Sequence, residues 1–262
     1  VGMWQESLEQ INSAIPVLQQ FKDTDDEAVA YMELMGTYGA RESEIKDLNK
    51  ALDYYGMAYR LLSKNHPERV ASLNLDIAEI DWDQGRFKDA IAKSTEALSY
   101  YKGLKDELGQ ANALITLAEA QTSDGNVQAA TQTLDLAAPL VNLVGNFYVT
   151  GRLYYGQAGL LKKEGRFKEA IEQYQRVIAM LEQFKSSASN SDDRRLVSET
   201  YSFIYDELID TYYSLGTSGR QYTLSSADKA LEYTELNKSR VFANSWGQIF
   251  IDGLRRQVPT QL

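Results

Sequence analysis

Hydrophobic residues recur every three or four positions through most of the chain, with polar residues between them. This spacing predicts amphipathic α-helices, and the strict alternation typical of β-strands is not seen. Helical segments of this kind end at three glycines, Gly85, Gly125 and Gly165, which lie 40 residues apart. A glycine just past a helix can adopt the left-handed conformation that terminates the helix. Each unit is therefore predicted to be a helix, a glycine turn and a second helix.

The residues that follow each glycine also repeat. GRFKDAI begins at Gly85 and GRFKEAI at Gly165, with a weaker copy, GNVQAAT, at Gly125. A fixed period of this length is typical of a repeat architecture. An alanine on each second helix is predicted to face an alanine on the first, because small residues let two helices approach closely. The three predicted pairs are Ala78 with Ala90, Ala118 with Ala130, and Ala158 with Ala170.

We predict one continuous array over residues 1–262, because stacked repeats need no division into compact domains. Its parts are an N-terminal helix in 1–24, repeats at about 27–66, 70–110, 111–150, 151–187 and 193–245, and a C-terminal extension or linker at 246–262. Pro16 lies inside the first helix and is expected to bend or divide it.

Two segments, ALDYYGMAY at 51–59 and LIDTYYSLG at 208–216, carry aromatic, small and leucine residues in a recognisable order. With the 40-residue period, they make the chain resemble the tetratricopeptide repeat family over about 230 positions. The resemblance implies an all-α fold, a right-handed superhelical solenoid of helical hairpins. Three residues depart from the family pattern: Asp81 and Gln121 replace a usual aromatic, and Pro139 falls within a predicted helix.

The same resemblance implies that the first helix of each unit lines a concave surface that binds a peptide or a protein segment. Trp82, Tyr155 and Tyr213 are expected to be aromatic anchors, in a groove that is acidic in its first half and basic around Arg152. The outward positions are Ser72, Leu75, Glu79, Trp82, Asp83, Asn112, Ile115, Glu119, Thr122, Arg152, Tyr155, Gly159, Lys162, Lys163, Phe203, Asp206, Asp210 and Tyr213.

Composition narrows the classes of partner. Asp and Glu outnumber Lys and Arg by 37 to 27, giving a formal charge of −10, so we expect no nucleic-acid partner. No apolar run is long enough to predict a membrane span, and no secretion signal is visible. The chain has no cysteine, which fits a reducing compartment, and we expect a cytoplasmic location. Whether a leader peptide was removed upstream of Val1 is a question that the sequence leaves open.

Candidate chemistry is sparse. The one histidine, His66, lies between repeats, whereas a catalytic dyad needs a nucleophile and an orienting group beside it. The acidic run at 23–27 lacks the glycine and the distal glutamate of a calcium loop and is more typical of a helix N-terminus. We therefore expect no cofactor, no metal and no catalysis, but a protein-binding scaffold whose terminal repeats could also pair two copies.

An alternative comes from the C-terminal segments ALEYTELNKSRVFANSW and LRRQVPTQL. Over about 30 residues they resemble the last repeat and connector that precede a caspase-like peptidase domain of the CHAT type. This second resemblance implies a fragment, whose histidine and cysteine dyad would lie beyond Leu262. The region would then be the regulatory arm of a larger peptidase.

Overall fold

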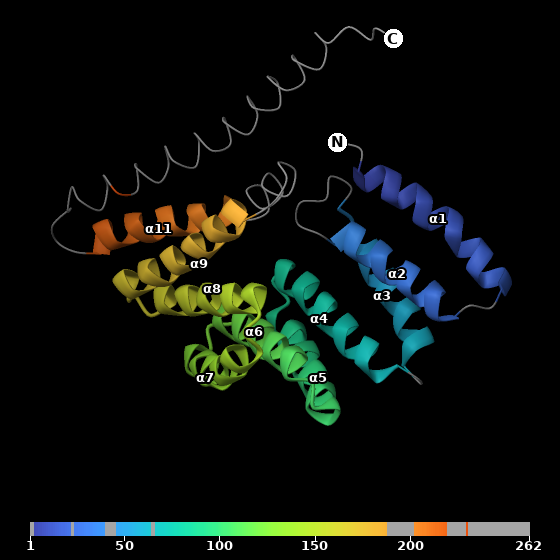
Figure 1. Cartoon of the computed structure of the whole chain (residues 1–262), viewed down its shortest axis with the longest axis horizontal. Coiled ribbons are helices and arrows are strands. Elements are labelled where there is room, and N and C mark those ends of the chain that lie inside the picture. Colours follow the sequence, from blue (N-terminus) through green and yellow to red (C-terminus); the bar gives the residue numbers. More distant parts are fainter. Residues whose placement is uncertain are drawn as a thin grey trace, which may run out of the picture. The chain divides into compact units, whose positions relative to one another are not determined.

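The computed structural model describes residues 3–21, 24–39, 46–63, 66–187, 202–218 and 229 (Figure 1). Every regular element in these residues is an α-helix, which confirms the all-α prediction. The helices are α1 Met3–Phe21, α2 Thr24–Gly39, α3 Leu48–Leu62, α4 Pro67–Asp83, α5 Phe87–Leu104, α6 Glu107–Ser123, α7 Val127–Val144, α8 Phe147–Lys163, α9 Phe167–Ser187 and α11 Ser202–Ser218.

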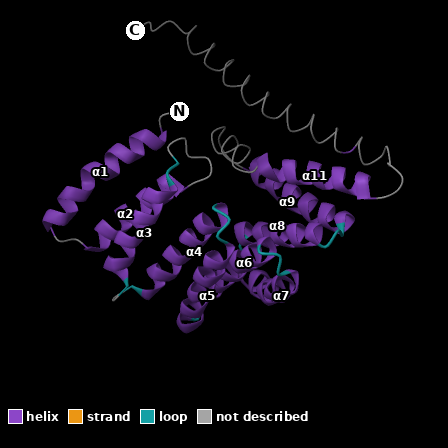
Figure 2. Cartoon of the chain, turned by 180° about the vertical axis from the view of Figure 1, so that it is seen from behind, coloured by secondary structure: helices purple, strands orange, loops and turns teal. Residues whose placement is uncertain are grey.

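The helices form two compact units, residues 1–149 and 150–262, with the boundary in the first turn of α8. In the first unit α2 pairs with α3, α4 with α5 and α6 with α7, and α1 packs on α2 (Figure 2). In the second unit α9 packs on α11 and shares a core with α8. We call α2, α4, α6, α8 and α11 the A helices, and α3, α5, α7 and α9 the B helices. The prediction of one continuous array remains a prediction.

Three glycines end A helices in the same way. Gly85, Gly125 and Gly165 have φ angles of 73°, 85° and 74°, the left-handed conformation expected of them. At Gly85 two backbone hydrogen bonds close the helix, from Gly85 N to Trp82 O at 3.0 Å and from Arg86 N to Asp81 O at 2.9 Å. The other two glycines have the same pair of bonds, which satisfies the last carbonyls of each helix.

The predicted alanine pairs lie in the core. Ala78 and Ala90 belong to one hydrophobic cluster and Ala158 and Ala170 to another, and all four side chains are fully buried. Ala118 and Ala130 are also buried, at 1% and 0% exposure. Small side chains at these positions allow the two helices of each hairpin to pack closely.

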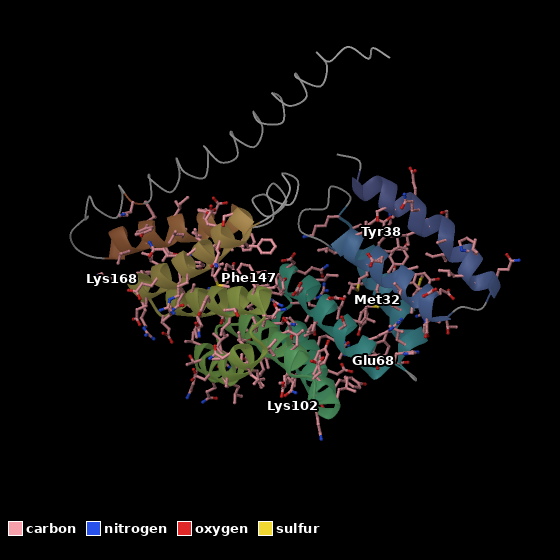
Figure 3. The ribbon with its side chains drawn as sticks, viewed as in Figure 1. Met32, Tyr38, Glu68, Lys102, Phe147 and Lys168 are labelled. Atoms are coloured by element: carbon pink, nitrogen blue, oxygen red, sulfur yellow. The ribbon has the colours of Figure 1, made fainter. Side chains whose placement is uncertain are left out.

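Tyrosines dominate the core between α2 and α3. The ring of Tyr54 stacks between those of Tyr31 and Tyr38, with centroid distances of 6.1 and 5.8 Å. Met32 packs against the same cluster, and Figure 3 shows it with Tyr38 on α2. Ile15 of α1 reaches this core as well, so α1 covers the first hairpin. Aromatic burial of this kind stabilises a small core efficiently.

The prolines do not interrupt their helices. Pro16 lies within α1 and Pro139 within α7, and both helices continue through them, so the expected division of the first helix is wrong. Both prolines are exposed, so water can hydrogen-bond to the carbonyl that loses its donor. None of the described helices has the length and apolarity needed to cross a bilayer. Of the repeat predicted at 193–245, α11 and Lys229 are described, and the extension at 246–262 lies outside the described residues.

Candidate partner-binding surface

One face of α4 is open to solvent. From Ser72 to the end of the helix, the residues that are not buried are Ser72, Asp76, Glu79, Trp82 and Asp83, spaced three or four apart with one adjacent pair. This spacing places them on a single face. We call these five residues the α4 stripe.

Three residues that the sequence placed outward are in the core instead. Leu75 is 9% exposed, Ile115 is fully buried and Thr122 is 8% exposed, so their predicted outward orientation is wrong. Asp76 takes the place of Leu75 on the open face, because burying leucine is favourable whereas burying a carboxylate is costly. The adjacent apolar and charged residues were the signal that could have identified Asp76. On α6, Asn112 and Glu119 are half-buried and Thr122 is buried.

Acidic residues are concentrated on the A helices of the first unit. Helices α2, α4 and α6 carry eleven acidic residues and one basic residue, whereas α3, α5 and α7 carry four and five. The helix α4 packs against both α2 and α6, so the three A helices are neighbours. Their charges therefore add, and this layer of the unit has a negative potential.

Asp76 has the most perturbed carboxyl of this layer. Burial, with smaller contributions from the carboxylates of Glu79 and Glu33, raises its pKa to about 7. Asp76 has no hydrogen bond or ion pair with any described residue. The carboxyl is thus poised between its neutral and charged forms near neutral pH.

Other residues of the α4 stripe contact neighbouring segments. The Trp82 indole N–H donates a hydrogen bond to Ser123 Oγ at 2.7 Å, which joins α4 to α6. Lys46, which precedes α3, lies 3.4 Å from the carboxylate of Asp83. Trp82 is therefore part of the contact between repeats as well as of the open face.

Asp81 and Gln121, two of the three residues that depart from the pattern of the family that the sequence resembles, have polar partners. Asp81 is 5% exposed, and its carboxylate accepts hydrogen bonds from the guanidinium of Arg86, one of them from Nε at 2.9 Å. Burial raises the pKa of Asp81 and the charge of Arg86 opposes this shift. Gln121 Oε1 accepts a hydrogen bond from Thr133 Oγ1 at 2.8 Å. A polar side chain is tolerated at this position because each has a hydrogen-bonding partner.

In the second unit, the predicted aromatic residues pack together. Tyr155 makes edge contacts with Phe203 and Tyr174, with ring centroids 5.5 and 5.9 Å apart. Both Tyr155 and Phe203 are half-buried, whereas Tyr213 is 60% exposed. Tyr155 and Phe203 thus form part of the packing between α8 and α11, and Tyr213 is the exposed member of the three predicted aromatics.

Lys162 joins the two A helices of the second unit. Its ammonium lies 2.7 Å from Glu207 Oε2 and 2.7 Å from Asp210 Oδ2, both on α11. Burial lowers the pKa of Lys162, but hydrogen bonds to Asp210 and Glu207 outweigh burial and raise it. Of the other predicted residues here, Lys163 and Asp206 are exposed and Arg152 is half-buried.

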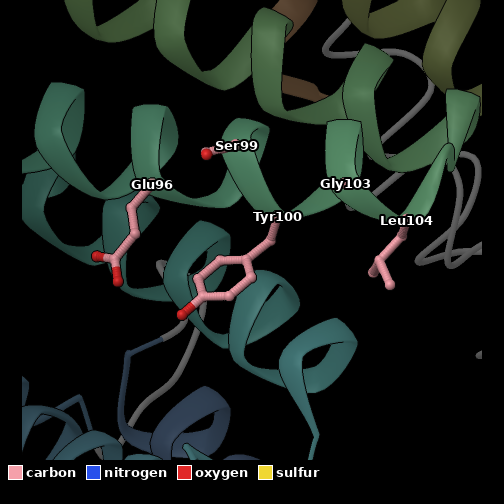
Figure 4. Close-up of a pocket in the computed structure, with 5 residues that line it drawn as sticks. All are labelled: Glu96, Ser99, Tyr100, Gly103 and Leu104. Atoms are coloured by element: carbon pink, nitrogen blue, oxygen red, sulfur yellow. The ribbon is translucent and has the colours of Figure 1, made fainter.

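Two other features of the described surface are a hollow on α5 and the surroundings of His66. A shallow hollow of about 460 Å³ lies on the B helix α5, lined by Glu96, Ser99, Tyr100, Gly103 and Leu104 (Figure 4). The described residues contain no cluster of three or more His, Cys, Asp or Glu side chains that could hold a metal ion. His66 lies beside two carboxylates, with its Nε2 3.0 Å from Asp25 Oδ1. Neither His66 nor its carboxylate neighbours Asp25 and Glu68 are among the residues that line the hollow on α5.

No protein-family model and no curated protein sequence matches the chain. Among the solved structures that are similar to it are the following two. BtubC (BKLC) from P. vanneervenii has a TM-score of 0.64 and 14% sequence identity, over 90% of this chain and 92% of its own. Aspartyl phosphate phosphatase F from Bacillus subtilis has a TM-score of 0.63 and 15% identity, over 88% of this chain and 64% of its own. These similarities show that the chain has the all-α fold of helical-repeat proteins.

Proposed function

We propose that this chain is a scaffold of the tetratricopeptide type, which binds a segment of another protein along the open faces of its A helices. The α4 stripe carries the proposal, because from Ser72 onward it holds the side chains of α4 that are not buried, at regular spacing, while the residues between them are packed in the core. Tyr213, exposed on α11, offers an aromatic anchor of the kind enriched at protein interfaces.

In this proposal the chain itself does no chemistry. Trp82, Tyr155 and Lys162 contribute mainly by holding neighbouring helices, since each contacts another helix of its own unit. Partner contacts then fall to the more exposed members, above all Glu79, Asp206 and Tyr213. A homodimer through the terminal repeats and a location in the cytoplasm remain predictions of the sequence.

Photo-crosslinking in the source cells tests the surface. A benzoylphenylalanine at Glu79 or at Tyr213 is expected to give adducts with the partner, identified by mass spectrometry. The matched controls are Asp53 on α3 and Asp135 on α7, which are equally exposed but lie on B helices. Adducts with the same protein from the control positions, or none from Glu79 and Tyr213, would contradict the assignment.

The alternative, a regulatory arm of a CHAT-type peptidase, rests on residues 230–246 and 254–262. All of these residues lie outside the described part of the chain. This alternative therefore remains a prediction from the sequence. It also requires a partner-binding surface, so the crosslinking experiment applies to both.

A further inference from the structure

The distribution of charge between the two layers of the first unit narrows the chemistry of the partner. The A helices carry eleven acidic residues against one basic residue, while the B helices are close to balance. A negative potential confined to one layer attracts a cationic segment to that layer and repels an acidic one. The proposed binding face and the acidic layer coincide, because Asp76, Glu79 and Asp83 all lie on the α4 stripe.

Asp76 adds an observation that a merely solvated acidic face would not give. An exposed carboxylate keeps its charge through hydration, whereas Asp76 is only partly exposed, and burial raises its pKa. The charged groups acting on it are both negative, Glu79 on its own helix and Glu33 on α2. From α5, the hydroxyl of Tyr101 also faces it, and the pKa of that tyrosine is raised to about 12, chiefly by burial.

The site at Asp76 therefore lacks a positive charge. A buried carboxyl in such surroundings can bind a proton, or it can be compensated by a cation that arrives from outside. Asp83, nearer the end of the same stripe, already has such a cation in Lys46 at 3.4 Å. No described residue places a cation beside Asp76 in the same way.

We propose that the α4 stripe, flanked by Glu33 of α2 and Glu119 of α6, binds a lysine- or arginine-rich segment of the partner protein, with one cationic side chain seated against Asp76. This inference rests on the proposed function and specifies the partner's chemistry. The other cationic side chains of the segment contact Glu79 and Glu33. Because these two glutamates are exposed, they position the segment along the surface and do not bury its charges.

The test is calorimetric titration of the full chain at pH 7 with a peptide of alternating lysine and alanine. Binding is expected to release about half a proton, because Asp76 is about half protonated at this pH and a nearby cation favours its charged form. Titrations in two buffers with different ionisation enthalpies measure this release. The Asp76→Asn variant is expected to bind about tenfold more weakly, with no proton release.

A matched pair of charge variants separates the site from general attraction. Glu33→Gln with Glu79→Gln removes two exposed charges from the A layer and is expected to weaken binding about tenfold. Asp53→Asn with Asp135→Asn removes two exposed charges from the B layer and is expected to change the affinity less than about twofold. The two proteins have the same net charge.

Three results would overturn the inference: equal losses in the two double variants, proton release that persists in Asp76→Asn, or equal binding of an alternating glutamate and alanine peptide. If crosslinking at Glu79 captures a partner while the basic peptide fails, the surface stands and its proposed chemistry falls. If both experiments fail, the proposed function falls as well.

Discussion

At the scale of single residues, the position of a charge relative to the core decides its effect. Asp76 and Asp81 lie on the same helix and are both withdrawn from water, yet Asp81 is bonded to Arg86 and Asp76 to no described residue. Burial raises the pKa of both carboxyls, but at Asp81 the guanidinium of Arg86 opposes the shift, whereas at Asp76 the neighbouring carboxylates add to it. The two residues therefore respond differently to pH and to mutation.

Asp76→Asn should change how stability depends on pH. The native state keeps the proton of Asp76 up to about pH 7, whereas an unfolded chain loses it near pH 4, so unfolding releases a proton between these values. Rising pH therefore lowers the free energy of unfolding by up to about 1.4 kcal/mol per unit in this window. The variant lacks this slope, and its advantage over the wild type should be about 2–3 kcal/mol larger at pH 8 than at pH 5.

Urea unfolding at the two pH values measures the difference. The control is Asp53→Asn, which removes an exposed aspartate and should leave the pH dependence unchanged. Parallel pH profiles for the wild type and Asp76→Asn would show that the carboxyl of Asp76 is charged in the native protein throughout.

Arg86→Ala tests the ion pair at the end of α4. Loss of the guanidinium leaves the buried Asp81 carboxylate uncompensated and should cost about 2 kcal/mol, less than a fully buried pair because Arg86 is one-third exposed. The control is Arg166→Ala, at the equivalent position two hairpins later. Both acidic partners of Arg166, Glu164 and Glu169, are exposed residues. Its effect on the urea midpoint should be small. Equal losses at the two sites would mean that burial of Asp81 does not matter.

Prediction from the sequence failed at this scale by one position. The periodicity of α4 is compatible with either Leu75 or Asp76 on the open face, because neighbouring positions are only about 100° apart around the helix. The cost of burying a carboxylate settles the choice, and that argument was available from the two residue types. The partner of Asp81 was harder to find, since a contact five residues away depends on how the chain turns at Gly85.

At the scale of elements, local chemistry decides where a helix begins and ends. The helix α3 begins after Asp47 because that side chain accepts hydrogen bonds from the N–H groups of Asn49 and Lys50. The glycine turns were predicted, since a left-handed residue is needed at the end of each A helix. Pro16 does not divide α1, because an exposed helix can satisfy the missing bond with water.

Two glycine substitutions should have opposite effects on stability. Gly125→Ala places a side chain at φ 85° and should cost about 1 kcal/mol, whereas Gly103→Ala inside α5 should add about 0.5–1 kcal/mol through helix propensity. Neither new methyl group meets another atom within 4 Å, so the backbone conformation is the difference between the sites. Thermal unfolding of both variants measures it, and shifts of the same sign would refute the role given to the turn.

At the scale of the whole molecule, each hairpin contacts mainly its neighbours. The helix α4 packs on α5, α6, α3 and α2, all of which belong to the first unit. Stability in such a fold is approximately a sum of local terms, so a perturbation should remain local. The sequence predicted this arrangement through its period, but a period says nothing about which contacts join two compact units.

Hydrogen exchange of Arg86→Ala tests this locality. Protection should fall most in α4 and α5, less in α6 and α7, and not measurably in α9 and α11, because the lost interaction lies in one hairpin of the first unit. Mass spectrometry of peptides from each helix gives the profile. A uniform loss across both units would show instead that the chain unfolds as a single cooperative body.

The bond between Asp81 and Arg86 also limits how such a chain can be shortened or lengthened. Units of equal length with the same turn invite splicing, and removal of 40 residues should yield a smaller protein with an unbroken register. The joint matters, however, because a cut directly after Gly85 would discard Arg86 and leave Asp81 alone in the core. A cut that removes 87–126 keeps the pair and brings Ala130 opposite Ala78. The repeats look interchangeable in sequence. Because of the side chain of Arg86, however, they can be joined after residue 86 but not after residue 85.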